Sequence, residues 1–98
     1  MKIRDLRNPP QWLILASVAH EEVTVGRTDH RVVWQNGEWR DGVWQGDEWQ
    51  DGVWRSGLWL GGVWQNGEWQ GGEWQNGVWQ NGVWRGGEWR GGVGRDSG

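Results

Sequence analysis

A tryptophan recurs at every fifth position from Trp34 to Trp89, so that twelve of the thirteen tryptophans belong to one uninterrupted series. Each of them lies in a unit Trp-x-x-Gly-x, with one departure at Gly46-Asp47. A strict short period over most of a chain indicates that one small structural unit is copied and that the copies stack to bury their apolar side chains. The tract is therefore expected to fold as a stack of repeats.

The residues between the tryptophans exclude a helix. The third and fourth places of each unit are mostly Asn-Gly, Asp-Gly, Ser-Gly or Gly-Gly, which accept a positive φ and bend the chain. In a helix, each such glycine costs about 1 kcal/mol relative to alanine. A five-residue period also spreads tryptophan around a helix of about 3.6 residues per turn. We therefore expect a bend in every unit and β structure between the bends.

Two β architectures fit such a bend. The first is a meander of three-residue strands with Asn-Gly turns, and the segment Trp34–Trp39 resembles the turn of designed tryptophan-zipper hairpins. Identical two-residue turns at both ends of a strand need an even number of strand residues, because the backbone hydrogen-bonding groups alternate sides. Three is odd, so the meander fails. The second architecture bends the same way in every unit and winds into a coil with the tryptophans inside.

Ten of the twelve repeat tryptophans have a small residue, glycine, two places before them. The small residues are Gly37, Gly42, Gly52, Gly57, Gly62, Gly67, Gly72, Gly77, Gly82 and Gly87. This register resembles the pentapeptide-repeat family, and similar tracts occur in bacteriophage and bacterial proteins. The resemblance implies a right-handed quadrilateral β-helix with four faces per coil.

The expected fold is thus all-β, a short right-handed β-solenoid of about three coils with tryptophan inward. Its core stack comprises Trp34, Trp39, Trp44, Trp49, Trp54, Trp59, Trp64, Trp69, Trp74, Trp79, Trp84 and Trp89. Four faces per coil predict one outward column of Val43, Val63 and Val83 and another of Glu48, Glu68 and Glu88.

Residues 1–32 contain no repeat and are expected to cap the first coil, which otherwise exposes unpaired backbone. Val23–Val25 and Arg31–Trp34 are rich in β-branched residues and flank the turn-like Gly26–His30, so a hairpin is predicted there. The segment Trp12–Ala16 is apolar on every side, and periodicity does not separate strand from helix. The solenoid is expected over 33–93 and a polar tail over 94–98.

Composition excludes several classes of function. The chain has no cysteine, which rules out thiol chemistry and disulfides, and its net charge of −3 does not suit a nucleic-acid-binding surface. No apolar run approaches the roughly 20 residues that cross a bilayer. The basic start and the apolar Trp12–Val18 imitate a secretory signal only loosely, because Asp5 and Pro9-Pro10 interrupt it. We expect a soluble protein, cytoplasmic or in a virion rather than secreted.

No candidate catalytic or cofactor-binding residues emerge. The serines have no recognisable base partner, and no Gly-Lys-Ser/Thr follows the glycine pairs. His20-Glu21-Glu22 and Asp29-His30 match no metal-ligand spacing, so we expect no metal site. A non-enzymatic structural or protein-interaction module is the leading interpretation.

The outward positions offer a candidate interaction surface. Both residues that flank Trp59 are apolar and should face solvent, and such patches often mark protein contacts. At the end of the tract, Gly94 stands where a thirteenth repeat tryptophan belongs, so we expect the last coil to self-associate or to join another subunit. The candidate surface comprises Leu58, Leu60, Val43, Val63 and Val83.

Three alternatives stay open. Some pentapeptide-repeat proteins mimic DNA and inhibit topoisomerases, and this tract has a mild excess of acidic residues. If the indoles faced outward, they would form a ladder for carbohydrate. A leader followed by Trp-x-Asn and Trp-x-Asp units also resembles precursors of cross-linked ribosomal peptides.

Overall fold

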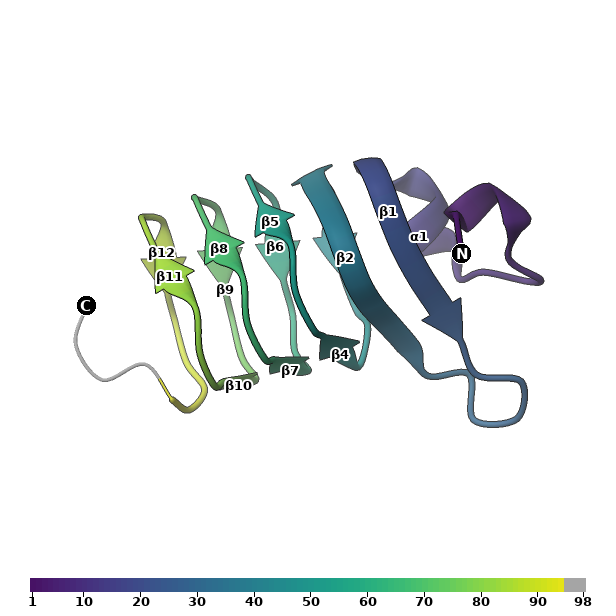
Figure 1. The fold of residues 1–98 in the computed structure, drawn as a ribbon. Helices are drawn as coiled ribbons and strands as arrows, with labels where there is room; N and C mark the ends of the chain where they lie inside the picture. Colours follow the sequence, from purple (N-terminus) through teal and green to yellow (C-terminus); the bar gives the residue numbers. More distant parts are fainter. Residues whose placement is uncertain (95–98) are drawn as a thin grey trace.

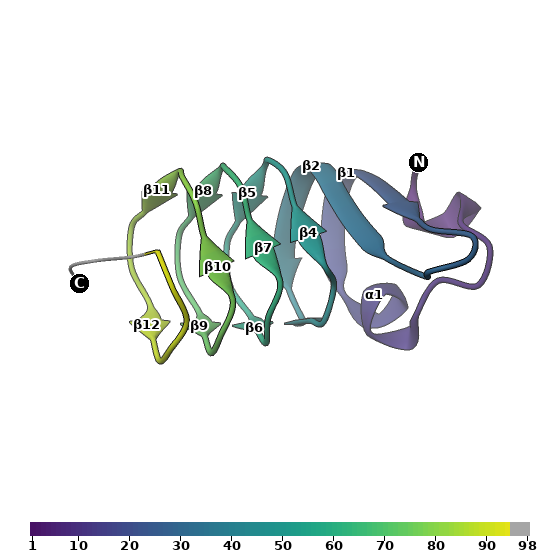
Figure 2. The same cartoon turned by 90° about the horizontal axis from the view of Figure 1, so that it is seen from below.

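The computed structural model describes residues 1–94 and shows a right-handed solenoid whose coils stack along one axis (Figures 1 and 2). A 3-10 helix η1 (Ile3–Asp5) and a helix α1 (Gln11–Leu15) precede the long strands β1 (Ser17–Val25) and β2 (Val32–Asp41). The remaining strands have two residues each: β3 (Val43–Trp44), β4 (Glu48–Trp49), β5 (Val53–Trp54), β6 (Leu58–Trp59), β7 (Val63–Trp64), β8 (Glu68–Trp69), β9 (Glu73–Trp74), β10 (Val78–Trp79), β11 (Val83–Trp84) and β12 (Glu88–Trp89).

Each coil contains three repeats. Trp34 pairs in parallel with Trp49, and Trp49 with Trp64, so the register advances by fifteen residues. Face A consists of the start of β2 with β4, β7 and β10, and face B of the end of β2 with β5, β8 and β11. Face C consists of β3, β6, β9 and β12. The tract makes about four coils.

The expectation of four faces and about three coils is therefore wrong. Val43 pairs with Leu58 rather than lying in a column with Val63 and Val83, and Glu48 lies between Val33 and Val63. The reason is the size of indole. Within the first coil the rings of Trp34, Trp39 and Trp44 already touch, with centroids 5.7–6.4 Å apart, so three rings fill the interior.

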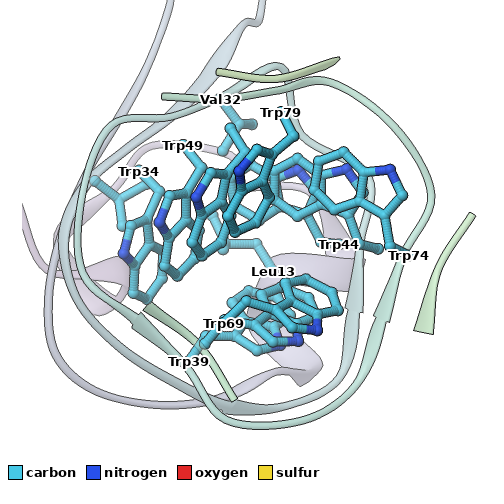
Figure 3. Close-up of a cluster of buried hydrophobic side chains, with 13 residues drawn as sticks. Leu13, Val32, Trp34, Trp39, Trp44, Trp49, Trp69, Trp74 and Trp79 are labelled. Carbon is cyan, nitrogen blue, oxygen red and sulfur yellow. The ribbon is translucent and has the colours of Figure 1, made fainter. Parts of the chain in front are cut away.

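The core is three columns of stacked indoles, one per face (Figure 3). Along each column successive rings lie 4.7–5.1 Å apart and within 3–8° of parallel. Neighbouring columns meet edge to face, as Trp59 and Trp64 do at 72°. Both geometries are favoured by the charge distribution of aromatic rings. From Trp34 to Trp74 the repeat tryptophans have no exposed surface, which confirms that they point inward.

Glycine is required where one coil passes over the next. Gly67 has a φ of +122°, and a Cβ there would lie 2.3 Å from the carbonyl oxygen of Gly52 in the coil below. Gly52 stands in the same relation to Gly37, at 2.4 Å. An L residue at these positions meets both a strained backbone and a clash. This double constraint explains why the small residue of the repeat is glycine rather than alanine.

The N-terminal segment covers the first coil. The predicted hairpin is confirmed: Val25 pairs with Val32, and the Gly26 N–H donates to the Arg31 carbonyl at 2.9 Å. Strand β1 continues antiparallel along β2, so it covers the open edges of faces A and B. Helix α1 contacts β3 and so lies beside face C. Of the predicted polar tail 94–98, residues 95–98 lie outside the described residues.

Candidate interaction surfaces

The two ends of the solenoid differ in how their tryptophans are covered. At the N-terminal end Trp12 packs on the rings of Trp39 and Trp44, with centroids 6.4 and 5.2 Å away. At the C-terminal end Trp89 stacks on Trp74 alone and is half-buried, whereas Trp39 and Trp44 have no exposed surface. Gly94 supplies no ring above Trp79. The ring of Trp89 thus has an outer face on which no described ring stacks.

Backbone groups also point out of this end. In lower coils the Trp44 carbonyl accepts from Leu60 N–H of the coil above at 3.1 Å, and the Trp79 N–H donates to the Val93 carbonyl at 2.8 Å. Each tryptophan therefore directs both backbone groups toward the C-terminal end. Strand β12 is the last strand of its sheet, so among the described residues the N–H and C=O of Trp89 meet no further strand.

Charges on the faces follow a diagonal rule. Arg90 donates to Glu73 in the coil below at 2.9 Å, and Arg85 makes the same contact with Glu68. In both contacts the partner lies seventeen residues earlier, one coil and two positions back. Arg55 with Glu38 and Gln65 with Glu48 have the same spacing. This spacing is visible in the sequence, and it is the signal that would have predicted three repeats per coil.

Glu88 is the glutamate of the tract for which the described chain holds no such partner. The Glu88 side chain is 68% exposed and contacts Arg90, two residues further along the chain, at 3.4 Å. Arg90 lies between Glu73 and Glu88 and offsets the repulsion between these two stacked carboxylates. The open end therefore carries an acceptor on its rim.

The predicted apolar surface is divided among the faces. Val43 and Leu58 are neighbours on face C, and Leu60 follows on the same face. Val63 lies on face A and Val83 on face B, so these two valines do not join the face C patch of Val43, Leu58 and Leu60. A shallow groove between α1 and β3 extends the face C patch, with Leu15 73% exposed on its border.

The polar residues of the cap have structural surroundings. His20 lies in a bulge of β1, whereas His30 lies just after the hairpin turn, and both have a positive φ. Within residues 1–94 no group of three metal-ligating side chains gathers. The amino group of Met1 donates a hydrogen bond to Glu22 and lowers the pKa of that carboxyl. No helix in the described part of the chain has the length and apolar character needed to span a bilayer.

In comparisons with known proteins, no family model matches this sequence, and neither the curated proteins nor the solved structures contain a match to it.

Proposed function

We propose that this chain is a non-enzymatic structural and protein-interaction module that assembles through its C-terminal coil, with copies of itself or with another subunit. The observation that carries the proposal is the difference between the two ends. One end is covered by β1 and α1, and the other presents the indole of Trp89 and the edge of β12, which meets no further strand within residues 1–94.

Exposed strand edges and apolar patches are features that proteins usually cover, because both promote association. Here the two occur together on the last coil. A solenoid whose described residues cover one end and leave the last coil uncovered is suited to contact a partner at that last coil.

The five-residue period, the inward large residue and the small residue two places before it are the grounds for kinship with the pentapeptide-repeat family and with tracts of phage and bacterial proteins. The three-sided coil departs from the four-sided coil of that family. We therefore carry over only the structural role.

The alternatives have weaker support. A carbohydrate ladder needs outward indoles, and these rings lie inside. A DNA mimic needs a continuous acidic surface, whereas Glu38, Glu68 and Glu73 are each paired with arginine. A cross-linked precursor would lose hydrogen at its Trp-x-Asn units, which intact mass would reveal.

Oxidative footprinting read by mass spectrometry tests the proposal. Trp89 should be oxidised readily in the dilute chain and become protected either at high concentration or inside cells that express it. Trp59, which lies deeper on the same face, should resist oxidation throughout and serves as the internal control. Oxidation of Trp89 that stays high under all these conditions would overturn the assembly role.

A further inference from the structure

We propose that the partner of the open end is a second copy of this chain, bound end to end about a twofold axis that passes through the middle of β12. This inference rests on the proposed function and names its partner. It follows from the shape of the last coil, from the backbone groups of Trp89 and from the charges beside it.

Identical chains with one open end each have one closed way to cover both ends, which is to bring them together. The N-terminal end is covered by β1 and α1, so head-to-tail stacking would have to displace the cap. A twofold dimer uses the same patch on both chains and leaves no open end.

The winding of the chain fixes where the axis lies. The last three segments in chain order are β11 on face B, β12 on face C and Val93–Gly94 on face A, where Val93 bridges to Val78. Each lies one third of a coil further along the solenoid axis than the one before. An axis through the middle segment sets β12 against its twin and β11 against Val93–Gly94 of the twin, with equal gaps at all three faces. With the axis through β11 or through Val93–Gly94, one pair of facing segments would lie too far apart and another pair too close together.

On this axis the two β12 strands run antiparallel with Trp89 opposite its twin. Because the N–H and C=O of Trp89 both point out of the end, each amide donates to the other's carbonyl. This is the hydrogen-bonded pair of an antiparallel ladder. The exposed faces of the two Trp89 rings are covered by the same contact.

The same register sets Glu88 opposite Arg90 of the twin and Arg90 opposite the twin's Glu88. Among residues 1–94, Glu88 has no partner in a following coil, and in the dimer the second copy supplies an arginine at that place. Directly opposed unlike charges stabilise an antiparallel pair, and like charges destabilise it. The dimer therefore contains two such pairs of opposite charge, which the twofold axis relates to each other.

The contact is small. The molecule is 24 × 18 Å across its long axis, so each copy buries on the order of 300–400 Å². The area that the two copies bury together is about half of that in a standard stable interface. We therefore expect a concentration-dependent dimer with a dissociation constant in the micromolar range or weaker, rather than a permanent one.

Single-cysteine variants test the register, because the chain has no cysteine of its own. Under mild oxidation, a mixture of the Glu88→Cys and Arg90→Cys chains should give a covalent dimer. Each variant alone should give several-fold less, since neither position faces itself. Equal cross-linking in the unmixed samples would overturn this register while leaving an end-to-end assembly in place.

Charge variants test the interface by analytical ultracentrifugation of the full chain. Glu88→Lys should weaken the dimer at least tenfold, because two lysines then face two arginines. The control is Gln35→Lys with Gln45→Lys, which raises the net charge equally but in the first coil, and it should dimerise as the unaltered chain does. An unaltered chain that stays monomeric up to about 1 mM would overturn the dimer. If Trp89 were nevertheless protected in cells, the proposed assembly role would stand with a different partner.

Discussion

Asp47 lies directly over Val32 and binds it twice. The Val32 N–H donates to the Asp47 carboxylate at 2.9 Å, and the Asp47 N–H donates to the Val32 carbonyl at 3.1 Å. At the same corner the later coils carry Gly62, Gly77 and Gly92. The one break in the repeat therefore joins the first two coils at the point where the chain leaves the cap.

Replacing Asp47 by alanine should destabilise the chain by about 1–2 kcal/mol, because the amide of the buried Val32 loses a charged acceptor. Urea unfolding followed by circular dichroism measures the change. The matched control is Asp51→Ala, since the Asp51 carboxylate accepts only from the adjacent Gly52 N–H. A loss at Asp51 as large as that at Asp47 would contradict a special role for the Val32 contact.

Substitutions at two glycines test where the fold requires glycine and where it only tolerates glycine. Gly67→Ala should cost more than about 2 kcal/mol, because the backbone is left-handed there and the new methyl meets the Gly52 carbonyl. Gly61→Ala should change stability by less than about 0.5 kcal/mol, since nothing lies within 4 Å of its Cβ position. Thermal unfolding of the two variants decides, and similar melting temperatures would argue against the stacked glycine column.

Stacking on two sides should stabilise more than stacking on one. Trp59 lies between Trp44 and Trp74 on face C, at 5.1 and 4.8 Å, whereas Trp89 stacks only on Trp74. Trp59→Ala should therefore cost about 3–5 kcal/mol and Trp89→Ala less than half of that. Both are measured in dilute solution, where association does not contribute. A larger loss at Trp89 would be inconsistent with an open C-terminal end.

A double-mutant cycle distinguishes a coil with three faces from a coil with four faces in solution. Glu68 and Arg85 should couple by about 0.3–1 kcal/mol when each is changed to glutamine, as expected for an exposed ion pair. In a four-sided coil the diagonal partner of Glu68 would instead be Arg90. The cycle of Glu68 with Arg90 should therefore show no coupling, and the reverse result would restore the four-sided coil.

The period of five was sufficient to predict the solenoid, because only stacked coils bury a tryptophan in every unit. Trp34 to Trp74 point inward as expected, and the hairpin around Gly26–His30 forms as its β-branched flanks and turn residues predict. Local residue preferences determine both features, so both can be predicted from the sequence.

The number of faces was not predicted, since it depends on how many indoles fill a cross-section. The resemblance to the pentapeptide-repeat family predicted four faces, whereas complementary residues such as Glu68 and Arg85 carry the observed register. Segment Trp12–Ala16 was likewise undecided, because its conformation depends on packing. Gln11–Leu15 is helical, with Leu13 fully buried and Trp12 against the first coil.

The stacked indole columns also determine the fluorescence of the chain. Trp39 lies 5.7 Å from Trp34 and from Trp44, with the ring planes inclined by 72–80°, so rings of different columns exchange excitation energy faster than they emit. Transfer between these inclined rings should strongly depolarise the emission. The excitation should collect on the rings with the lowest energy, which are those nearest water in the last coil. Native fluorescence would then report mainly on the C-terminal end.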